Sequence, residues 1–416
     1  MKKKIAGLGV PLFFILPWVG FLLSLFDIKS KKSAFIYVAF AMLFGYAISF
    51  TNDSADSYRY AQAFSRFDNT LDYNTIIQMY QNGELRDLYR LLLFYFTAIF
   101  TNNPKVMYAF AGLVYGIFSY LSLRIFIKEY QGKWDRYVLV LALIFFTYIS
   151  LSNINGFRFW TGALVLFYAV YNFIIERKNK WFIGILITPL FHYGFLLIIP
   201  LLILYRFIHP MLYNSKGVKP LLYYVFILSF MASWILGTNS INLGFLADVD
   251  TLSGAVGNRV QYLNSDSTTN LIEKRAENSL FLSVRKYFDY GIRIYVFIAI
   301  LFLYKLIKKM KGDKTAYTNI FAFVLFFYSF AFIAISFPSG VRFLNIAHMF
   351  FIVLLIKFYT IYDKRDFQQL IMVALPVFSF NILFINGMLP IMILTPTFWY
   401  GNVFWIIIEG LDFYVN

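Results

Sequence analysis

Long apolar runs fill most of this sequence, and they constrain its fold more than any other feature. A run of about 20 apolar residues spans the hydrocarbon core of a bilayer as an α-helix, whereas an isolated strand in lipid would leave its backbone N–H and C=O groups without partners. Charged residues make up only 14% of the chain, against about a quarter in a soluble domain. The runs fall at about 5–26, 34–50, 88–102, 106–127, 137–152, 157–175, 181–205, 221–237, 291–308, 317–336, 342–360, 368–386 and 389–408.

These runs predict an all-α, polytopic integral membrane protein with about 11–13 membrane-embedded helices, some of them short, broken or re-entrant. We expect one transmembrane domain over residues 1–416, with two polar insertions at about 51–87 and 238–290. The formal net charge of +16 arises from Lys and Arg in short loops between the runs. Because basic loops face the cytoplasm, this charge reflects topology and predicts no nucleic-acid partner, and both insertions are expected on the outer side. The basic loops lie at 29–32, 128–136, 177–180, 305–314 and 357–365.

Two runs do not fit a simple alternation across the membrane, and Lys2, Lys3 and Lys4 conflict with the same scheme because it places residue 1 outside. The run at 181–205 must return to its own side if 206–219 is also cytoplasmic, so we predict a break or re-entrant hairpin near Pro189 and His192. The run at 88–102 is short and is expected to be only partly inserted. The N-terminal run has the basic and apolar regions of a signal peptide but no small-residue cleavage site, which predicts a retained first helix.

The composition excludes several kinds of chemistry. The chain has no cysteine, so it has no disulfides, thiol nucleophiles or thiolate metal ligands. Its three histidines are far apart and match no metal-binding spacing. Asp248 and Asp250 form an Asp-x-Asp pair, but no nucleotide-binding fold surrounds them. We therefore predict no metal site and no cofactor.

Arginines open two of the apolar runs on the predicted outer side. In Asn155-Gly-Phe-Arg158, Asn155 is expected to cap the helix and Arg158 to lie in its first turn. Gly340-Val-Arg342-Phe343 repeats this pattern at a second helix start. A cation there opposes the helix dipole, yet a helix N-terminus with a guanidinium is a good receptor for phosphate oxygens. Both arginines are candidate catalytic residues that would bind one diphosphate. The alternative is that their side chains extend to the membrane–water interface without a catalytic role.

Two histidines lie inside apolar runs, where ionisable groups are candidates for function. His192, in Phe-His192-Tyr193-Gly, is a candidate for deprotonating or orienting a sugar hydroxyl, and Tyr193 beside it for binding substrate. His348 lies about two turns after Arg342 and is a weaker candidate for substrate binding. The alternative for both histidines is a neutral, hydrogen-bonded ring.

Further candidate substrate contacts lie in the insertions. Asp56 and Tyr60 share a helix face at i, i+4, and carboxylates and aromatic rings are suited to sugar hydroxyls and sugar faces. Arg90 follows the first insertion and Arg259 lies in the second. An ordinary solvated loop is the alternative for each insertion.

The run INGFRFWTGALVLFYAVYNFIIERKNKWFIGILITPLFHY resembles the EpsG-like branch of the Wzy-type polysaccharide polymerases. In that family an Asn-Gly-x-Arg turn opens a helix, a basic loop follows, and a hydrophobic stretch then ends in Phe-His. The family's Asp-x-x-x-Tyr element matches Asp56 and Tyr60, and its late Arg-Phe matches Arg342 and Phe343. The chain departs from the family at Phe159, where glutamine is common, and at 48–51, where an arginine is frequent.

The resemblance implies a membrane glycosyltransferase that polymerises undecaprenyl-diphosphate-linked repeat units into surface polysaccharide, such as O-antigen, capsule or exopolysaccharide. The implied partners are the lipid-linked donor and acceptor glycans, the bilayer and a chain-length regulator protein. The implied location is the bacterial cytoplasmic membrane, with the active site facing outward and no metal needed. Two alternatives stay open, which are a ligase that moves finished glycan to another acceptor and a flippase for lipid-linked glycans.

Overall fold

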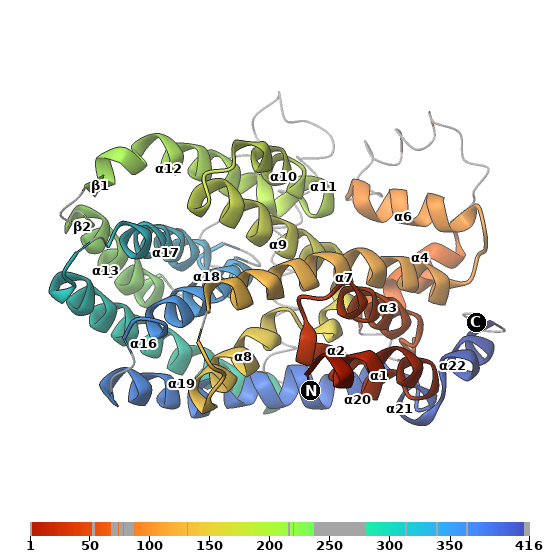
Figure 1. The fold of residues 1–416 in the computed structure, drawn as a ribbon. Coiled ribbons are helices and arrows are strands. Elements are labelled where there is room, and N and C mark those ends of the chain that lie inside the picture. Colours follow the sequence, from red (N-terminus) through yellow and green to blue (C-terminus); the bar gives the residue numbers. More distant parts are fainter. Residues whose placement is uncertain are drawn as a thin grey trace.

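The computed structural model is a bundle of α-helices (Figure 1). It describes residues 2–51, 55–67, 87–130, 132–214, 217–218, 220–236, 280–312, 314–337, 340–362 and 365–411, together with positions 74 and 78. Within these residues, six helical stretches are long and apolar enough to cross a membrane. They are Pro104–Glu129, Arg136–Ile175, Val284–Lys309, Thr315–Ala334, Arg342–Tyr359 and Arg365–Ile393, which confirms an all-α polytopic membrane protein.

These stretches contain the central helices of the bundle. They are α7 (Pro104–Glu129), α8 (Arg136–Tyr148), α9 (Phe157–Val170), α16 (Leu280–Lys309), α17 (Thr315–Ala334), α18 (Arg342–Tyr359) and α19 (Arg365–Leu383). Local sequence sets several of their starts. Asn103 caps α7 by accepting from the Lys105 N–H at 2.9 Å, and Asp135 caps α8 by accepting from the Tyr137 and Val138 N–H groups at 3.0 Å each.

The shorter helices pack around these or lie between them. They are α3 (Lys31–Tyr46), α4 (Asp56–Ser65), α6 (Leu88–Ala98), α10 (Phe182–Leu186), α11 (Thr188–Phe191), α12 (Ile198–Leu212), α13 (Pro220–Ile235), α20 (Leu389–Ile393), α21 (Thr397–Tyr400) and α22 (Val403–Leu411). The strands β1 (Tyr213–Asn214) and β2 (Gly217–Val218) form one antiparallel hairpin between α12 and α13. The 3₁₀-helix η2 (Leu151–Gly156) reverses the chain between α8 and α9.

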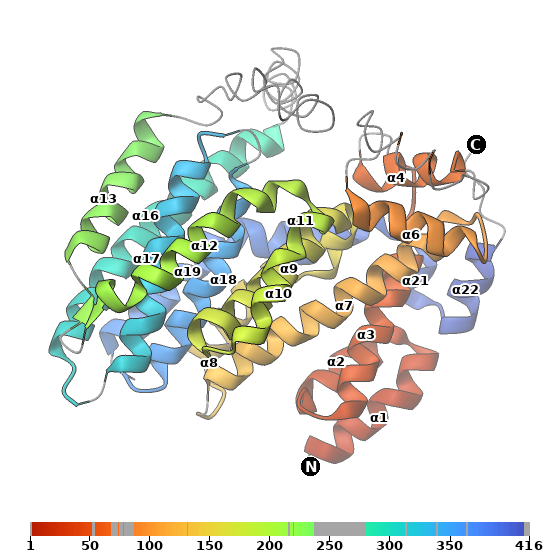
Figure 2. The same ribbon diagram turned by 90° about the horizontal axis from the view of Figure 1, so that it is seen from above.

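The basic loops gather at one end of the bundle, which we call the basic end (Figure 2). Lys128 pairs with Glu176 at 2.7 Å, and Tyr359 donates to Asp135 at 2.5 Å, so three of these loops meet there. At the opposite end, α4 and α6 lie over the start of α7, and the segments that flank both polar insertions emerge (Figure 2). The second insertion is shorter than predicted, because α16 already begins at Leu280 rather than after residue 290.

The N-terminal run does not form the single helix that the sequence predicted. Instead α1 (Lys2–Ile15) and α2 (Pro17–Ser24) are antiparallel. Pro17 breaks the helix, and Gly20 allows the close approach because a Cβ there would lie 2.7 Å from the Gly9 carbonyl oxygen. This hairpin returns both of its ends to the basic end, which removes the conflict between Lys2–Lys4 and the positive-inside rule.

The run at 181–205 is broken at His192, as predicted. His192 has extended backbone (φ −157°, ψ 119°) between α11 and the 3₁₀-helix η5 (Tyr193–Leu197). The following helix α12 runs back toward the basic end, where Arg206 donates to Asn179 at 3.4 Å. The re-entrant hairpin is therefore confirmed, and it places His192 near the opposite end, beside α6.

The last run is also rearranged relative to the prediction. A π-helical turn, η8 (Phe384–Met388), joins α19 directly to α20, so the predicted break at 386–389 is absent and the helix continues to Ile393. Leu394 then forms an antiparallel bridge with Ile48. The Ser49 N–H donates to the Ile393 carbonyl at 2.7 Å, and the Thr395 N–H donates to the Ala47 carbonyl at 2.9 Å.

Candidate functional site

Arg158 lies at the opposite end from the basic loops, where η2 passes into α9. Its Nε donates to the Tyr60 hydroxyl at 2.7 Å, its Nη1 forms an ion pair with Asp87, and its guanidinium carbon lies 4.9 Å from the centre of the Tyr60 ring. The Arg158 side chain is 17% exposed and that of Asp87 is 1% exposed. A guanidinium has five N–H donors, so donors of Arg158 remain for a ligand after these two contacts.

Asp87 connects Arg158 to the helix break at His192. Its second oxygen accepts from the Tyr193 N–H at 3.4 Å. Asp87 lies at the N-cap position of α6, but its side chain makes no capping hydrogen bond. One buried carboxylate therefore positions the start of α9 relative to the segment that carries His192 and Tyr193.

Asn155 does not cap α9, which corrects the sequence prediction. The 3₁₀-helix η2 runs directly into α9, whose N-cap residue is Gly156. The side-chain oxygen of Asn155 instead accepts from the Ser57 N–H at 3.1 Å, and its carbonyl accepts from the Tyr108 hydroxyl at 3.3 Å. Asn155 thus holds the first turn of α4 against η2.

Asp56 and Tyr60 lie on α4, as the i, i+4 pattern predicted. The Asp56 side chain is 37% exposed, forms an ion pair with Arg59, and lies beside Gly156, where an added Cβ would be 3.4 Å from its Oδ2. Burial raises the pKa of the Tyr60 phenol, against the opposing influence of the Arg158 charge. Tyr60 therefore stays protonated near neutral pH while it accepts from Arg158.

The Phe159 ring, next to Arg158 in sequence, packs beside two other candidate residues. The Arg342 guanidinium carbon lies 5.3 Å from its centre, in cation–π range, and the His192 ring centre lies 5.4 Å away, edge to face. Arg342 is half-buried and makes no hydrogen bond or ion pair with the residues that the structure describes. The two arginines that the sequence singled out therefore both lie at the start of α9.

The backbone of Gly194 occupies one of the two ring nitrogens of His192. Its Nδ1 accepts from the Gly194 N–H at 3.2 Å, and its ring stacks on that of Tyr193 with centres 5.1 Å apart. A neutral imidazole whose Nδ1 accepts carries its proton on Nε2. In this arrangement the ring is a donor that can orient a hydroxyl, rather than a base that removes its proton.

The structure describes one of the two remaining arginine candidates, Arg90. Arg90, one turn into α6, lies over the Tyr60 ring with its guanidinium carbon 5.9 Å from the ring centre. Arg90 is thus part of the cluster. Arg259 lies outside the described residues, as do Asp248 and Asp250.

His348 is separate from the Arg158 cluster. It is 5% exposed in the interior, where its Nδ1 and the Tyr328 hydroxyl share a hydrogen bond of 2.6 Å, and its ring packs 5.5 Å from that of Tyr148. These contacts come from α17, α18 and the end of α8. The structure therefore favours the neutral, hydrogen-bonded alternative for this residue.

Two polar features were missed from sequence. One is Asp87, whose signal was an acid directly before an apolar run. The other is a stripe of Arg285, Asp289 and Arg293 at i, i+4 and i+8 on α16. Arg293 is 4% exposed, and its Nε has no hydrogen-bond partner among the described residues. The sequence predicted a helix that starts at residue 291, so Arg285 and Asp289 were assigned to the second insertion.

Comparison with known proteins gives one match. The model of the EpsG family matches residues 32–393. This range includes every element of the Arg158 cluster and leaves out the hairpin of α1 and α2. No curated protein matches, and no solved structure matches.

Proposed function

The chain belongs to the EpsG family, the Wzy-like polysaccharide polymerases, and on that premise we propose that it joins oligosaccharide repeats carried on undecaprenyl diphosphate. The reaction takes place at the end of the bundle opposite the basic loops, which faces outward by the positive-inside rule. The membrane is the bacterial cytoplasmic membrane, and the product is a surface polysaccharide such as O-antigen, capsule or exopolysaccharide.

The meeting of Arg158 and Arg342 at the start of α9 carries this proposal. Two helix starts that are far apart in the sequence each bring a guanidinium to the first turn of α9: Arg158 belongs to that turn, and Arg342 lies over the ring of its neighbour Phe159. Arg158 is held in place by Asp87, whereas Arg342 has no carboxylate partner in the described chain. A diphosphate has the charge and the planar oxygen pairs that such groups bind, and the two α-helix N-termini add N–H donors.

The reaction we propose is a displacement at the anomeric carbon of the growing glycan. A hydroxyl of the incoming repeat forms a bond to that carbon, the bond from the carbon to the diphosphate oxygen breaks, and the hydroxyl proton passes to the departing diphosphate. Arg158 and Arg342 stabilise the negative charge that develops on the leaving group, work that a metal ion does in other enzymes. His192 orients the attacking hydroxyl through its Nε2 proton.

The sugars of the two substrates are placed against α4. Asp56 offers a partly exposed carboxylate for sugar hydroxyls, and the Tyr60 ring forms the wall beside Arg158. Tyr193 and Arg90 extend this surface on either side. Both substrates reach the site through the bilayer, since their lipid tails remain in it, and a chain-length regulator protein is a further proposed partner.

The direct test uses the purified chain in liposomes with lipid-diphosphate-linked repeats. We expect longer glycans together with free lipid diphosphate. Arg342→Gln should lower the rate by about 10²–10³, the usual effect of removing one charge-stabilising donor, and Arg158→Gln should do so as well. The control is Arg365→Gln, an exposed arginine at the basic end. Normal polymerisation by well-folded arginine variants would refute the mechanism.

The same assay separates the two alternative functions. Glycan moved once onto a different acceptor, with no increase in length, would identify a ligase. Substrate that crosses the bilayer without being consumed would identify a flippase.

The orientation can be tested separately, because the chain has no cysteine. Arg59→Cys, near the site, should react with an impermeant maleimide added outside intact cells, and Lys309→Cys should not. The reverse result would place the site on the cytoplasmic side and would contradict the proposal.

A further inference from the structure

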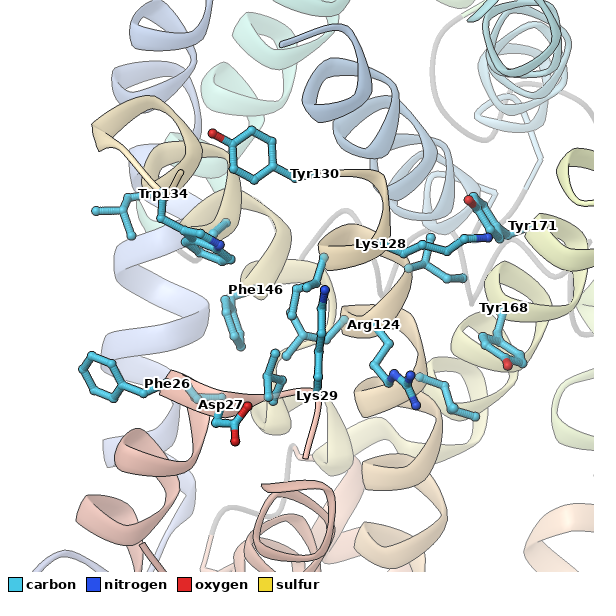
Figure 3. Close-up of a pocket in the computed structure, with 18 of the residues that line it drawn as sticks. Phe26, Asp27, Lys29, Arg124, Lys128, Tyr130, Trp134, Phe146, Tyr168 and Tyr171 are labelled. Carbon is cyan, nitrogen blue, oxygen red and sulfur yellow. The ribbon is translucent and has the colours of Figure 1, made fainter. Parts of the chain in front are cut away.

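A cavity of about 1520 Å³ opens at the basic end, between the N-terminal hairpin and helices α7, α8 and α9 (Figure 3). Its volume exceeds the roughly 300–1,000 Å³ of ordinary small-molecule sites. It lies at the far end of the bundle from the Arg158 cluster. The lining residues come from 22–29, 121–134, 139–146 and 168–178.

Apolar side chains form much of the wall of this groove. Phe26, Leu139 and Leu143 line it and are 57%, 52% and 47% exposed. Phe146 and Trp134 line it as well (Figure 3). In a membrane protein, exposed apolar surface of this kind is covered by lipid hydrocarbon, because water would leave it unfavourably hydrated.

Cations line the same groove. They are Lys29, Arg124, Lys128 and Lys178, with Asp27 as the acid among the lining residues. Glu176 pairs with both Lys128, at 2.7 Å, and Lys178, at 3.4 Å. Four cations less the two acids, Asp27 and Glu176, leave a net charge of +2.

Lys29 and Arg124 are the cations that remain available for a ligand. Both are exposed, and neither forms a hydrogen bond or an ion pair with another described residue. They come from opposite sides of the groove, Lys29 from the segment after α2 and Arg124 from α7, and both are drawn at its centre in Figure 3. An anion between them would be contacted from both walls.

We propose that this groove binds an anionic phospholipid of the leaflet at the basic end. Its phosphate lies between Lys29 and Arg124, and an acyl chain runs along Leu139, Leu143 and Phe146. Anionic lipids are abundant in the cytoplasmic leaflet and attract basic residues at this depth, so charge and location agree. The bound lipid links the N-terminal hairpin to α7 and α8. This site is independent of the glycosyl-transfer site proposed above.

The test compares lipid binding by the full chain and by matched variants in native mass spectrometry from detergent. The probes are phosphatidylglycerol and phosphatidylcholine with identical acyl chains. We expect phosphatidylglycerol to be retained preferentially, and the double variant Lys29→Gln/Arg124→Gln to bind it about thirtyfold more weakly. Lys309→Gln/Lys311→Gln, which removes the same charge from exposed residues outside the groove, should bind it as the unaltered chain does.

A second variant tests the apolar wall of the groove separately from its cations. Leu143→Trp fills the apolar wall but keeps every cation, and we expect it to lower phosphatidylglycerol retention as well. A phosphatidylglycerol with a photoreactive acyl chain should cross-link within 139–146. The proposal is overturned if phosphatidylcholine binds equally, if the control pair loses as much affinity as the groove pair, if cross-links fall elsewhere, or if only a polyisoprenyl diphosphate is retained.

Discussion

Replacing Asp87 with asparagine gives the most direct view of how the site is held together. Asp87→Asn keeps the shape of the side chain and removes its charge. Arg158, whose side chain is 17% exposed, then keeps its bond to Tyr60 but loses its ion-pair partner. Breaking a buried ion pair from one side costs about 3–5 kcal/mol, because the remaining charge is left uncompensated. The partial exposure and the retained hydrogen bond reduce our expectation to about 2–4 kcal/mol of unfolding free energy.

The assay is thermal unfolding of the purified protein, combined with the polymerisation assay. Asp87→Asn should lower the melting temperature by several degrees and reduce polymerisation, since asparagine has one acceptor oxygen and cannot accept from both Arg158 and the Tyr193 N–H. The double variant Asp87→Asn/Arg158→Gln should recover most of the stability, because it removes both charges, while it stays inactive. Asp366→Asn, an exposed acid at the basic end, is the control.

Two results would refute this reasoning. An unchanged melting temperature for Asp87→Asn would show that the ion pair does not stabilise the fold. Equal destabilisation in the double variant would show that the loss comes from packing rather than from an uncompensated Arg158 charge.

Three other polar groups, His348, Arg293 and Glu176, can be tested in the same way. His348→Phe should cost about 1–3 kcal/mol of stability by leaving the Tyr328 hydroxyl buried without a partner, while glycan length per folded protein stays normal; a selective loss of activity would return His348 to the site. Arg293→Met should leave the melting temperature unchanged or raise it, because the cost of burying Arg293 exceeds its attraction to Asp289, and a clear drop would show that Asp289 or the Tyr290 ring outweighs this cost. Burial of Glu176 tends to raise its pKa, but its two lysine partners outweigh this and the pKa is lowered from 4.5. Its stabilising contribution is therefore complete above pH 4.5 and is lost as the pH falls below that value, so the difference in melting temperature between the wild type and Glu176→Gln should shrink in acid; a constant difference would contradict the ion pairs.

The membrane helices and the break at His192 were predictable because their signals are local. Apolar run length sets a spanning helix, and a run whose two flanks are both basic must return to its own side. The α1–α2 hairpin was not predicted, since a run with a proline is also compatible with one kinked helix. What decides between them is the close approach of Gly20 to Gly9, which is a tertiary contact.

Most residues of the candidate site were predictable from the sequence, but the hydrogen bonds and ion pairs between them were not. Arg158, Tyr60 and Arg342 were identified from helix starts and from the insertion pattern. Asp87 was missed because its role depends on an arginine 71 residues away, a distance over which no periodicity acts. Asn155 was assigned to the wrong partner for the same reason. A capping residue bonds its own helix by default, and only the folded chain brings Ser57 within 3.1 Å of it.

The bridge between Ile48 and Leu394 bears on how the protein is made. Residues 47–49 lead into α4, which carries Asp56 and Tyr60, and their backbone partners at 393–395 leave the ribosome hundreds of residues later. Residues 47–49 therefore lack these partners during most of synthesis, and such long-range pairings form late. A nascent chain that has inserted its early helices therefore still lacks these backbone contacts, and we expect the proposed site to assemble only after residues 393–395 have been made.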